Sequence, residues 1–415
     1  MLNPKPRAEL PALSDDVRES PERGAPEPRS FAPRAEFHGV TLGSMRAPLA
    51  WAGLDASKLI YVAPEAANAP APLDEEARRK RALIVIPCLN EEALIAQVIA
   101  GILEDDGLVD PLVVVADGGS TDRSRQIVAE IAARDPRVKL MANPEKLQSA
   151  GVNRAARLLG EDRPWLVRID AHADYPKNYA STLIAEARRT GAHSVVVAMD
   201  TVGDGAFQRA VAAAQNSRLG TGGAAHRVGA DAGWVDHGHH ALFNRDAFQR
   251  VGGYDESFSH NEDAELDLRL TQEGAKIWLT GETRIVYHPR STPSALWKQY
   301  VSYGKGRCRT VLKHYTPLKV RQALPLAVAP AVLGALASPL FWPLAIPMLI
   351  WMATALVYGA VLGVKAKDPA IALSGPAAMI MHLGWSLGFW LQLARWIGQG
   401  RPPLDARLSP APAAS

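Results

Sequence analysis

The stretch Leu83-Ile84-Val85-Ile86-Pro87-Cys88-Leu89-Asn90-Glu91 starts as an apolar run and ends as a polar loop. The pattern returns in Leu112-Val113-Val114-Val115-Ala116-Asp117-Gly118-Gly119-Ser120-Thr121-Asp122, after an amphipathic stretch over 93–103. Two apolar runs of this length around an amphipathic segment are typical of a βαβ unit with parallel strands. Ligands of parallel sheets bind at the carboxyl ends of the strands, where both polar loops fall. The sequence therefore predicts a nucleotide pocket at these loops.

The second loop contains residues suited to such a pocket. Asp117 can accept hydrogen bonds from a base or a ribose, and Gly118 and Gly119 allow the backbone to approach a ligand closely. Ser120 or Thr121 is expected to cap the helix that follows. The Rossmann glycine fingerprint and the spacing of a P-loop are both missing from these glycines.

Composition sets the class of protein. The chain has 415 residues, of which 47% are hydrophobic, so it can form a large core. A net charge of +3 argues against a dedicated nucleic-acid binder. Cys88 and Cys308 lie far apart in the sequence, which gives no support to a disulfide framework or a cysteine metal site. A reducing compartment is the simpler expectation.

The chain divides into five parts. Residues 1–80 are rich in proline, arginine and glutamate and lack the apolar segment of a signal peptide, so we expect a mostly disordered extension with one short edge strand at 59–62. The remaining parts are an α/β domain over 81–293, a basic interfacial segment over 294–322, about three transmembrane helices over 323–395 and a tail over 396–415. Further strands of the α/β domain are expected at 138–141, 165–169, 194–199 and 277–279, in one mixed sheet covered on both faces.

The C-terminal part carries the membrane prediction. No charged residue or histidine occurs between Ala323 and Val364, which leaves room for two spans of about 20 residues each. The run Pro369 to Ala394, which contains His382, is a third candidate. This run either spans, as its length favours, or folds against the other helices without crossing, because Gly375-Pro376 interrupts it. The basic residues before the first span predict that the α/β domain faces the cytoplasm.

Two acidic segments are candidates for the chemistry. Asp170 in Asp170-Ala171-His172-Ala173-Asp174 follows an apolar run and could bind Mg²⁺ or Mn²⁺ together with His172 or Asp174. A solvated turn that caps the next helix explains this segment equally well. Asp263 in Asn261-Glu262-Asp263-Ala264-Glu265 could take the proton of an attacking hydroxyl. The same acids could instead be the first turn of a helix, where negative charge is favourable, and both interpretations can hold.

Two further segments border these acids in our interpretation. The histidine-rich stretch 237–240 has ligands too tightly spaced for a usual zinc site, and we expect residues such as His239 to line the acceptor side of the cleft. Tyr303 and Arg307 lie in a stretch that mixes aromatic, glycine and basic residues before the first span. Arg307 or Lys305 could neutralise a leaving diphosphate, although basic residues here can also attract anionic lipid head groups.

Four motifs in this order resemble those of the inverting family 2 glycosyltransferases, which have the GT-A fold. The motifs are Pro87-Cys88-Leu89-Asn90-Glu91, Asp117-Gly118-Gly119-Ser120-Thr121-Asp122, Asp170-Ala171-His172 and Glu262-Asp263. Other stretches are similar to the succinoglycan-type exopolysaccharide glucosyltransferases, namely 215–217, 220–223, 236–240, 261–265 and Tyr303-Gly304. The resemblance covers residues 82–395 and leaves out the N-terminal extension.

The resemblance implies an α/β fold of the GT-A nucleotide-diphospho-sugar transferase class with a C-terminal transmembrane helical region. It also implies roles for the matching positions: Pro87, Asn90, Glu91 and Asp117 hold the uridine, Asp170 the metal-bound diphosphate, and Asp263, beside Glu262, is the catalytic base. The common Asp-x-Asp pair is here Asp170-Ala171-His172, which leaves the second metal ligand open between His172 and Asp174. The Gln-x-x-Arg-Trp signature of processive synthases is missing, since Gln299 is followed by Tyr303-Gly304.

We therefore expect a membrane-anchored inverting hexosyltransferase at the cytoplasmic face of the bacterial plasma membrane. It would transfer glucose from UDP-glucose to a lipid-linked saccharide in exopolysaccharide biosynthesis, with Mg²⁺ or Mn²⁺ as cofactor. One alternative is transfer to a polyprenyl phosphate itself. Another is a processive synthase that extrudes its polymer, against which the nearly uniform apolarity of the spans argues, because a pore needs a polar lumen. A nucleotide-binding scaffold without catalysis ranks last because Asp263 is present.

Overall fold

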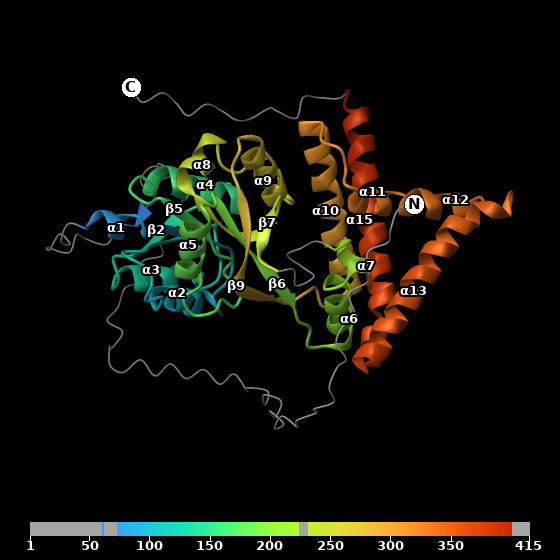
Figure 1. Cartoon of the computed structure of the whole chain (residues 1–415), viewed down its shortest axis with the longest axis horizontal. Coiled ribbons are helices and arrows are strands. Elements are labelled where there is room, and N and C mark those ends of the chain that lie inside the picture. Colours follow the sequence, from blue (N-terminus) through green and yellow to red (C-terminus); the bar gives the residue numbers. More distant parts are fainter. Residues whose placement is uncertain (1–59, 62–72, 224–230, 401–415) are drawn as a thin grey trace, which may run out of the picture. The chain divides into compact units, whose positions relative to one another are not determined.

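The computed structural model describes residues 60–61, 73–223 and 231–400. Its centre is a mixed sheet with the order β1-β4-β3-β2-β5-β8-β6-β9-β7 (Figure 1). The strands are β1 (Ile60–Tyr61), β2 (Ala82–Cys88), β3 (Leu112–Asp117), β4 (Val138–Ala142), β5 (Trp165–Arg168), β6 (Ser194–Thr201), β7 (Gly233–Val235), β8 (His239–Asn244) and β9 (Ile277–Tyr287). The part of the predicted extension that precedes residue 73 lies outside the described residues, except for β1.

The predicted βαβ unit is confirmed. Strands β2 and β3 are parallel, and their register pairs Leu83 with Leu112 at one end and Cys88 with Asp117 at the other. Strand β5 pairs with the other edge of β2, also in parallel. The loops after β2, β3 and β5 therefore all leave the sheet at the carboxyl ends of these parallel strands. The acidic segment at Asp170 lies at this end of the sheet, as do the two polar loops.

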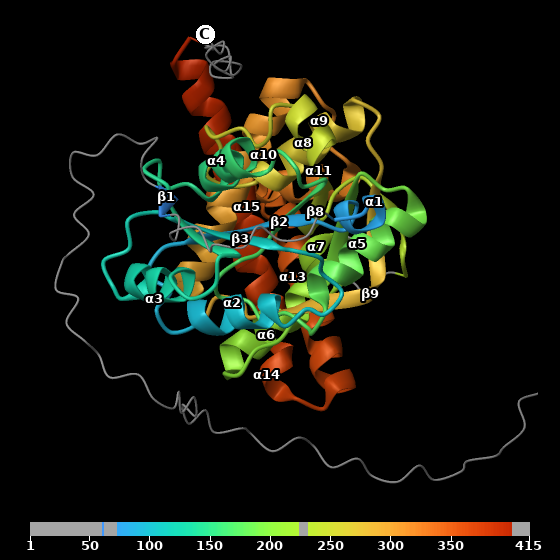
Figure 2. The ribbon, with the colours of Figure 1, turned by 90° about the vertical axis from the view of Figure 1, so that its left-hand side faces the viewer.

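Helices cover both faces of the sheet at β2 and β3, whose residues are all buried, as is typical of parallel sheets. Figure 2 shows α2 and α3 on one face of β2 and β3 and α4 on the other. The helices of this part are α1 (Glu75–Arg78), α2 (Ile95–Leu103), α3 (Ser124–Ala132), α4 (Gln148–Leu159), α5 (Tyr179–Thr190), α6 (Ala206–Gln215), α7 (Arg218–Thr221), α8 (Arg245–Arg250) and α9 (Glu262–Gln272). The core between strands and helices includes Leu83, Val114, Leu166, Phe243 and Leu266.

Three antiparallel pairings extend the sheet beyond the prediction. Strand β8 runs antiparallel to both β5 and β6, and β7 runs antiparallel to β9. Strand β9 continues to Tyr287, whereas the sequence predicts a strand over 277–279 alone. Its second half, Gly281–Tyr287, alternates exposed and buried residues and carries charges, so it lacks the continuous apolar character on which the prediction depended. Strand β8 begins at His239, inside the histidine-rich stretch.

The C-terminal helices are α10 (Pro293–His314), α11 (Val320–Leu326), α12 (Val328–Leu336), the 3₁₀ helix η2 (Trp342–Ala345), α13 (Ile346–Ala366), α14 (Pro369–Ala372) and α15 (Ser374–Gly398). Among the described residues, two helical segments are long and apolar enough to cross a membrane, 342–366 and 369–398. This count differs from the prediction of about three spans. The segment 323–341 is divided into short helices, because Pro325 lies inside α11 and a turn follows α12.

Helix α15 packs along α10, and the two helices run in the same direction (Figure 1). A Cβ atom at Gly304 of α10 would clash with the carbonyl oxygen of Trp385 in α15, and one at Gly388 of α15 would clash with the carbonyl oxygen of Val301. Glycine at these two positions therefore lets the helix backbones touch. The start of α15 also packs on α6, where Val211 and Ala214 contact Ala378 and its neighbours.

Candidate active site

Asn90 joins the two polar loops that follow β2 and β3. Its backbone is left-handed, with φ of 59°, a conformation that asparagine adopts more readily than most residues. Its side-chain oxygen accepts a hydrogen bond from the backbone N–H of Thr121 at 2.8 Å, and its own N–H donates to the hydroxyl of Ser120 at 2.9 Å. The structure thus brings together the two loops that the sequence assigns to one nucleotide pocket.

The carboxylate of Asp117 shapes its own loop. It accepts hydrogen bonds from the backbone N–H groups of Gly119 at 2.9 Å and Ser120 at 3.2 Å. Gly119 has φ of 90°, which a residue with a side chain rarely adopts. Gly118 donates its N–H to the carbonyl oxygen of Cys88 at 2.8 Å, which closes the loop onto β2.

The expected cap of α3 is wrong. Neither Ser120 nor Thr121 caps this helix, because both are used to hold Asn90. Asp122 takes the role near the helix start, where its carboxylate accepts a hydrogen bond from the N–H of Ser124 at 3.0 Å. The sequence prediction named Ser120 or Thr121, but in the structure both residues contact Asn90 in the neighbouring loop.

A buried arginine organises the acidic residues. Arg168, the last residue of β5, has a side chain that is 9% exposed, and its guanidinium lies 2.8 Å from the Asp263 carboxylate. It also lies 3.5 Å from Glu262 and 3.5 Å from Asp170. Burial alone would lower the pKa of Arg168, but the charges of Asp263 and Asp170 raise it well above its ordinary value. One cation therefore holds three carboxylates at the carboxyl end of β5.

Asp263 is held by three donors. Besides Arg168, the hydroxyl of Tyr254 donates to its Oδ1 atom at 3.1 Å, and Nδ1 of His239 lies 3.0 Å from its Oδ2 atom. Burial alone would raise the pKa of Asp263, but the charge of Arg168 and the contact with His239 lower it well below its usual range. Burial and the neighbouring charge of Asp263 raise the pKa of Glu262. Of the two adjacent acids, Asp263 is the one held in the ionised form.

Both acids lie in the first turn of α9. Asn261 precedes the helix with a left-handed φ of 68°, and the chain then enters the helix at Glu262. Negative charge in the first turn of a helix is favourable because the free N–H groups point toward it. The helix-start interpretation of this segment is therefore confirmed, and the same turn carries the partly buried carboxylate of Asp263.

Two histidines contact successive acids on α9. His237 lies 2.7 Å from the carboxylate of Asp267, one turn after Asp263, just as His239 contacts Asp263. The two imidazole rings meet edge to face, with centroids 4.9 Å apart. Burial, followed by the charge of Arg307, lowers the pKa of His237 to about 4. His239, which we expect to border the cleft, and Asp263, the candidate base, thus lie side by side.

The candidate metal ligands Asp170, His172 and Asp174 contact different residues. Asp170 is beside Arg168, whereas His172 is 57% exposed and its ring lies 3.2 Å from the Glu91 carboxylate. Asp174 is exposed, and its backbone bridges to Val286. Within the described ranges, no group of three or more His, Cys, Asp or Glu side chains could hold a metal ion. Such an ion would fit here in the way Mg²⁺ usually binds, through one or two carboxylates and the phosphates of a substrate.

The two α10 candidates, Tyr303 and Arg307, have neighbours in the segments that surround the candidate base. Tyr303 accepts a hydrogen bond from Gln299 at 3.0 Å, and its ring packs near His260 with centroids 6.3 Å apart. Arg307 lies close enough to His237 to affect its pKa, which places it near the histidine pair. Burial lowers the pKa of Arg307 to about 10, and the neighbouring charge of Arg321 adds to this effect.

Sequence reasoning missed two residues of this site, Arg168 and Tyr254. A signal existed for Arg168, because a charged residue inside the apolar run 165–169 must find partners when the strand is buried. Tyr254 follows Gly252-Gly253, which in the sequence indicates a turn and nothing about the direction of the ring. Its contact with Asp263 depends on how the turn after α8 folds back onto α9.

The comparisons with known proteins agree with this geometry. The model of the family "Glycosyl transferase family 2" matches residues 83–252. The chain is 50% identical over 319 residues to the succinoglycan biosynthesis protein ExoA of Rhizobium meliloti (strain 1021), a match that covers 77% of this chain and 97% of the relative. The chain belongs to glycosyl transferase family 2, and its fold is of the GT-A class.

More distant matches are shorter or weaker. A 70-residue segment is 31% identical to the O-antigen biosynthesis protein RfbC of Myxococcus xanthus, which covers 15% of this chain and 6% of that protein. Among solved structures, the mannosyltransferase PcManGT from Pyrobaculum calidifontis in complex with GDP-Man and Mn2+ matches with 19% identity and a TM-score of 0.49, over 75% of this chain and 87% of that one. TarS 1-349 of S. aureus in complex with UDP matches with 14% identity and a TM-score of 0.38, over 77% of this chain and 92% of that one.

Proposed function

We propose that this glycosyltransferase moves a hexose, glucose from UDP-glucose, onto a lipid-linked saccharide in exopolysaccharide biosynthesis, with inversion at the sugar carbon. The relative that is 50% identical is a succinoglycan biosynthesis protein, which supports a role in exopolysaccharide biosynthesis. The observation that carries the proposal is the carboxylate of Asp263, held ionised by Arg168 beside Asp170 at the ligand-binding edge of the sheet.

Inverting transfer needs one base, and Asp263 has the required state. In the proposed step, Asp263 takes the proton of the acceptor hydroxyl while the hydroxyl oxygen attacks the sugar carbon. The bond between that carbon and the diphosphate oxygen breaks, and UDP leaves with the electron pair. A pKa below the usual range keeps Asp263 ionised at neutral pH, so it carries no proton when the acceptor hydroxyl arrives. Glu262, whose pKa is raised to about 7, is partly protonated at neutral pH and is therefore the second candidate for this role.

The donor would occupy the nucleotide loops. In this proposal Pro87, Asn90, Glu91 and Asp117 bind the uridine, and the backbone at Gly118 and Gly119 borders the ribose or the diphosphate. Asp170 would hold Mg²⁺ or Mn²⁺ with the diphosphate, and the ion would neutralise charge that develops on the leaving group. His172 can join this site when its ring leaves Glu91. On the acceptor side, His239 and Tyr303 would line the path of the saccharide, and Arg307 would neutralise the leaving diphosphate.

Apolar side chains on α12, η2 and α13 support attachment to the membrane. Leu336 is 75% exposed, Leu340 is 91% exposed and Trp342 is 71% exposed, and α13 adds Ile350 and Val357 to the same uncovered surface. Large exposed apolar surfaces mark sites of contact with lipid or protein. We propose that 320–341 and 342–366 form a hairpin in the cytoplasmic face of the bacterial plasma membrane.

Helix α15 is the segment that we propose does not cross. Its start packs on α6 of the catalytic domain. Its end, at Arg395, lies near Arg309 of α10. Burial lowers the pKa of Arg309, and the positive charge of Arg395 lowers it further. Arg309 in turn donates to the carbonyl oxygen of Ser257 at 2.6 Å. Because both ends of α15 lie beside the catalytic domain, this arrangement supports the alternative in which the third run folds against the other helices.

A panel of radiolabelled UDP-sugars tests the proposal. Membranes that contain the protein are incubated with each sugar, and the lipid extract is analysed for labelled product. We expect label from UDP-glucose in a single-sugar extension of a lipid-linked saccharide. Label on a polyprenyl phosphate alone would instead identify the first alternative, and a long polymer would identify a processive synthase. No labelled lipid with any of the sugars would contradict the proposed function.

A further inference from the structure

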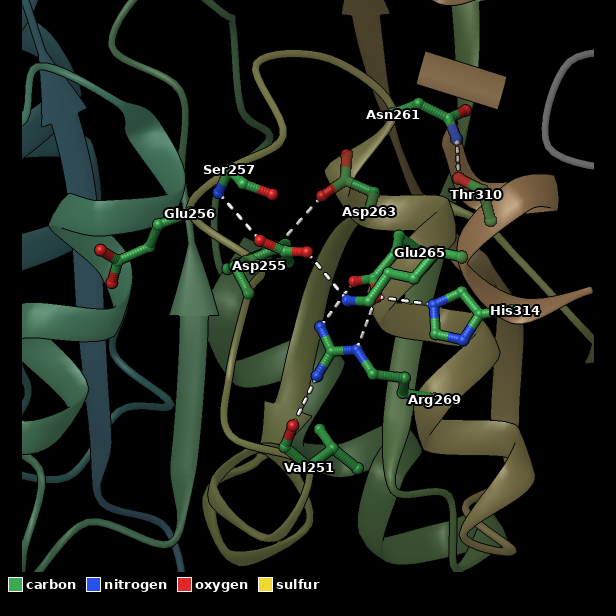
Figure 3. A network of polar contacts seen from close by, with 12 residues as sticks. Val251, Asp255, Glu256, Ser257, Asn261, Asp263, Glu265, Arg269, Thr310 and His314 are labelled. Atoms are coloured by element: carbon green, nitrogen blue, oxygen red, sulfur yellow. Dashed lines mark hydrogen bonds and ion pairs between the residues drawn. The ribbon is translucent and has the colours of Figure 1, made fainter. Parts of the chain in front are cut away.

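A second buried carboxylate lies on α9, two residues after Asp263. The side chain of Glu265 is 0% exposed, and its partners come from α9 itself and from the end of α10 (Figure 3). Its Oε1 atom accepts from Nζ of Lys313 at 2.8 Å and lies 2.8 Å from Nε2 of His314. Arg269 donates to both oxygens, at 2.9 and 2.6 Å. This cluster touches none of the residues assigned to the nucleotide or the metal.

The cluster also reaches the loop before α9. Lys313 lies 2.8 Å from Asp255, and the amide of Asn261 donates to the hydroxyl of Thr310 at 3.0 Å (Figure 3). A Cβ atom at Gly306 would lie 2.7 Å from the Cβ atom of Asn261, so α10 approaches this loop as closely as glycine allows. One face of α10 therefore contacts Asn261, directly before Glu262-Asp263, and Glu265, two positions after Asp263.

The opposite contacts of α10 are with α15. Gly304 lies directly against the backbone of Trp385 and Phe389, and Val301 against Gly388. Helix α10 has 22 residues, which corresponds to about 33 Å at the rise of an α-helix. It therefore connects the apolar C-terminal helices to the first turn of α9 through one continuous helix.

We propose that Glu265 is a positioning residue for Asp263, through which α10 sets the place of the catalytic base. The inference rests on the proposed function, because it concerns the base of that reaction. Asp263 lies in the first turn of α9, so its position relative to the acceptor depends on the position of α9 itself. Two bonds from α10 to one buried carboxylate, those of Lys313 and His314, and the Asn261–Thr310 bond beside them fix α9 against α10. A base misplaced by about 1 Å can lower the rate about 100-fold without a change in binding.

The test compares Glu265→Gln with a matched control elsewhere in the fold. Glu186 on α5 is also a buried carboxylate, 6% exposed, and it accepts from Arg189, from Nε1 of Trp278 at 2.9 Å and from the hydroxyl of Thr280 at 2.9 Å. Its contacts lie within α5 and β9, away from α9. Glu186→Gln therefore removes a comparable set of bonds without touching the base. Lys313→Met and Glu265→Asp complete the series, the first from the α10 side and the second as the conservative replacement.

The measurements are kcat and KM for the nucleotide sugar, the dissociation constant of UDP and the melting temperature, all on the full chain in lipid. We expect Glu265→Gln and Lys313→Met to lower kcat about 10- to 100-fold while KM and UDP affinity change less than about twofold. Glu265→Asp should recover part of kcat. Glu186→Gln should lower the melting temperature and leave kcat within about twofold of the parent protein.

Two results would overturn the inference. One is an unchanged kcat in Lys313→Met, which still applies if Glu265→Gln fails to fold. The other is an equal fall of kcat in Glu186→Gln, because the effect would then follow from stability alone. Failure of the proposed function is recognised separately, since the unaltered protein would then transfer no hexose.

Discussion

Replacing Arg168 by methionine tests the organisation of the acidic residues. Methionine keeps the apolar stem of the side chain and removes the guanidinium that contacts Asp170, Glu262 and Asp263. All three carboxylates are less than one fifth exposed, so water screens them only in part. We expect a loss of stability and a dependence of that loss on pH.

The magnitude follows from the burial of the pair. Removing one partner of a buried ion pair costs about 3 to 5 kcal/mol, and the partial exposure of the carboxylates favours the lower value, about 3 kcal/mol. For a domain of this size each kcal/mol corresponds to about 2 to 4 °C, so the melting temperature should fall by about 6 to 12 °C near neutral pH.

The pH dependence has a definite sign. In the parent protein the pKa of Asp263 is lowered, so its contribution to stability is present above the unfolded pKa of about 3.9. In Arg168→Met the three neighbouring carboxylates repel one another, which raises their pKa values in the folded state. The variant is then least stable where they are all ionised, and it regains stability as the pH falls through the raised values. The difference in melting temperature should therefore shrink between pH 7.5 and pH 5.

Arg163→Met is the matched control. The Arg163 side chain is 8% exposed, but its carboxylate partner Asp110 is 39% exposed and keeps water after the arginine is removed. Its difference from the parent protein should stay nearly constant over the same pH range. Thermal unfolding of both variants at several pH values provides the measurement. An Arg168→Met difference that is constant or larger at pH 5 would refute this account of the acidic cluster.

Three further predictions use other parts of the site and the membrane region. His239→Ala removes one donor to Asp263, so the pKa of Asp263 rises and the acid limb of the kcat/KM profile should move toward higher pH; an unmoved limb would count against the contact. Asp170→Ala should abolish the Mn²⁺ dependence of UDP binding in calorimetry, and equal binding with and without chelator in the parent protein would reject the metal site. A reporter active only in the cytoplasm, fused after Ser415, should give signal, because α15 lies beside the catalytic domain at both ends; a silent fusion would mean that α15 crosses.

The parallel half of the sheet was predictable because its strands are short apolar runs that end in polar loops. The register of β2 with β3 then brings Asn90 beside Ser120 and Thr121, as the loop order required. Strand β8 and the second half of β9 were not predictable in this way. Their residues alternate or carry histidines, and they become strands because β5 and β6 offer them edges, which is a property of the folded sheet.

The candidate site, too, was predictable from the sequence only in part. The sequence order of Asp117, Asp170 and Asp263 indicated a cleft, since these acids follow strands or begin a helix. It could not indicate that Arg168 would stand among three carboxylates or that Glu265 would be bound by the end of α10. The contacts of Arg168 with Asp263 and of Glu265 with Lys313 join residues separated by more than forty positions, and they depend on how α9 and α10 pack in the fold. The packing of α15 on α10 and α6 was also beyond sequence reasoning, because such contacts cannot be read from hydropathy.

The most direct test of the central claim is transfer by Asp263→Asn. The amide keeps the size of the side chain but cannot accept the proton of the acceptor hydroxyl. We measure hexose transfer to endogenous lipid in membranes and, on the same protein, the affinity for UDP. The account predicts that transfer is lost while UDP affinity stays near that of the parent protein. Transfer at more than about a tenth of the parent rate would contradict the assignment of Asp263 as the catalytic base.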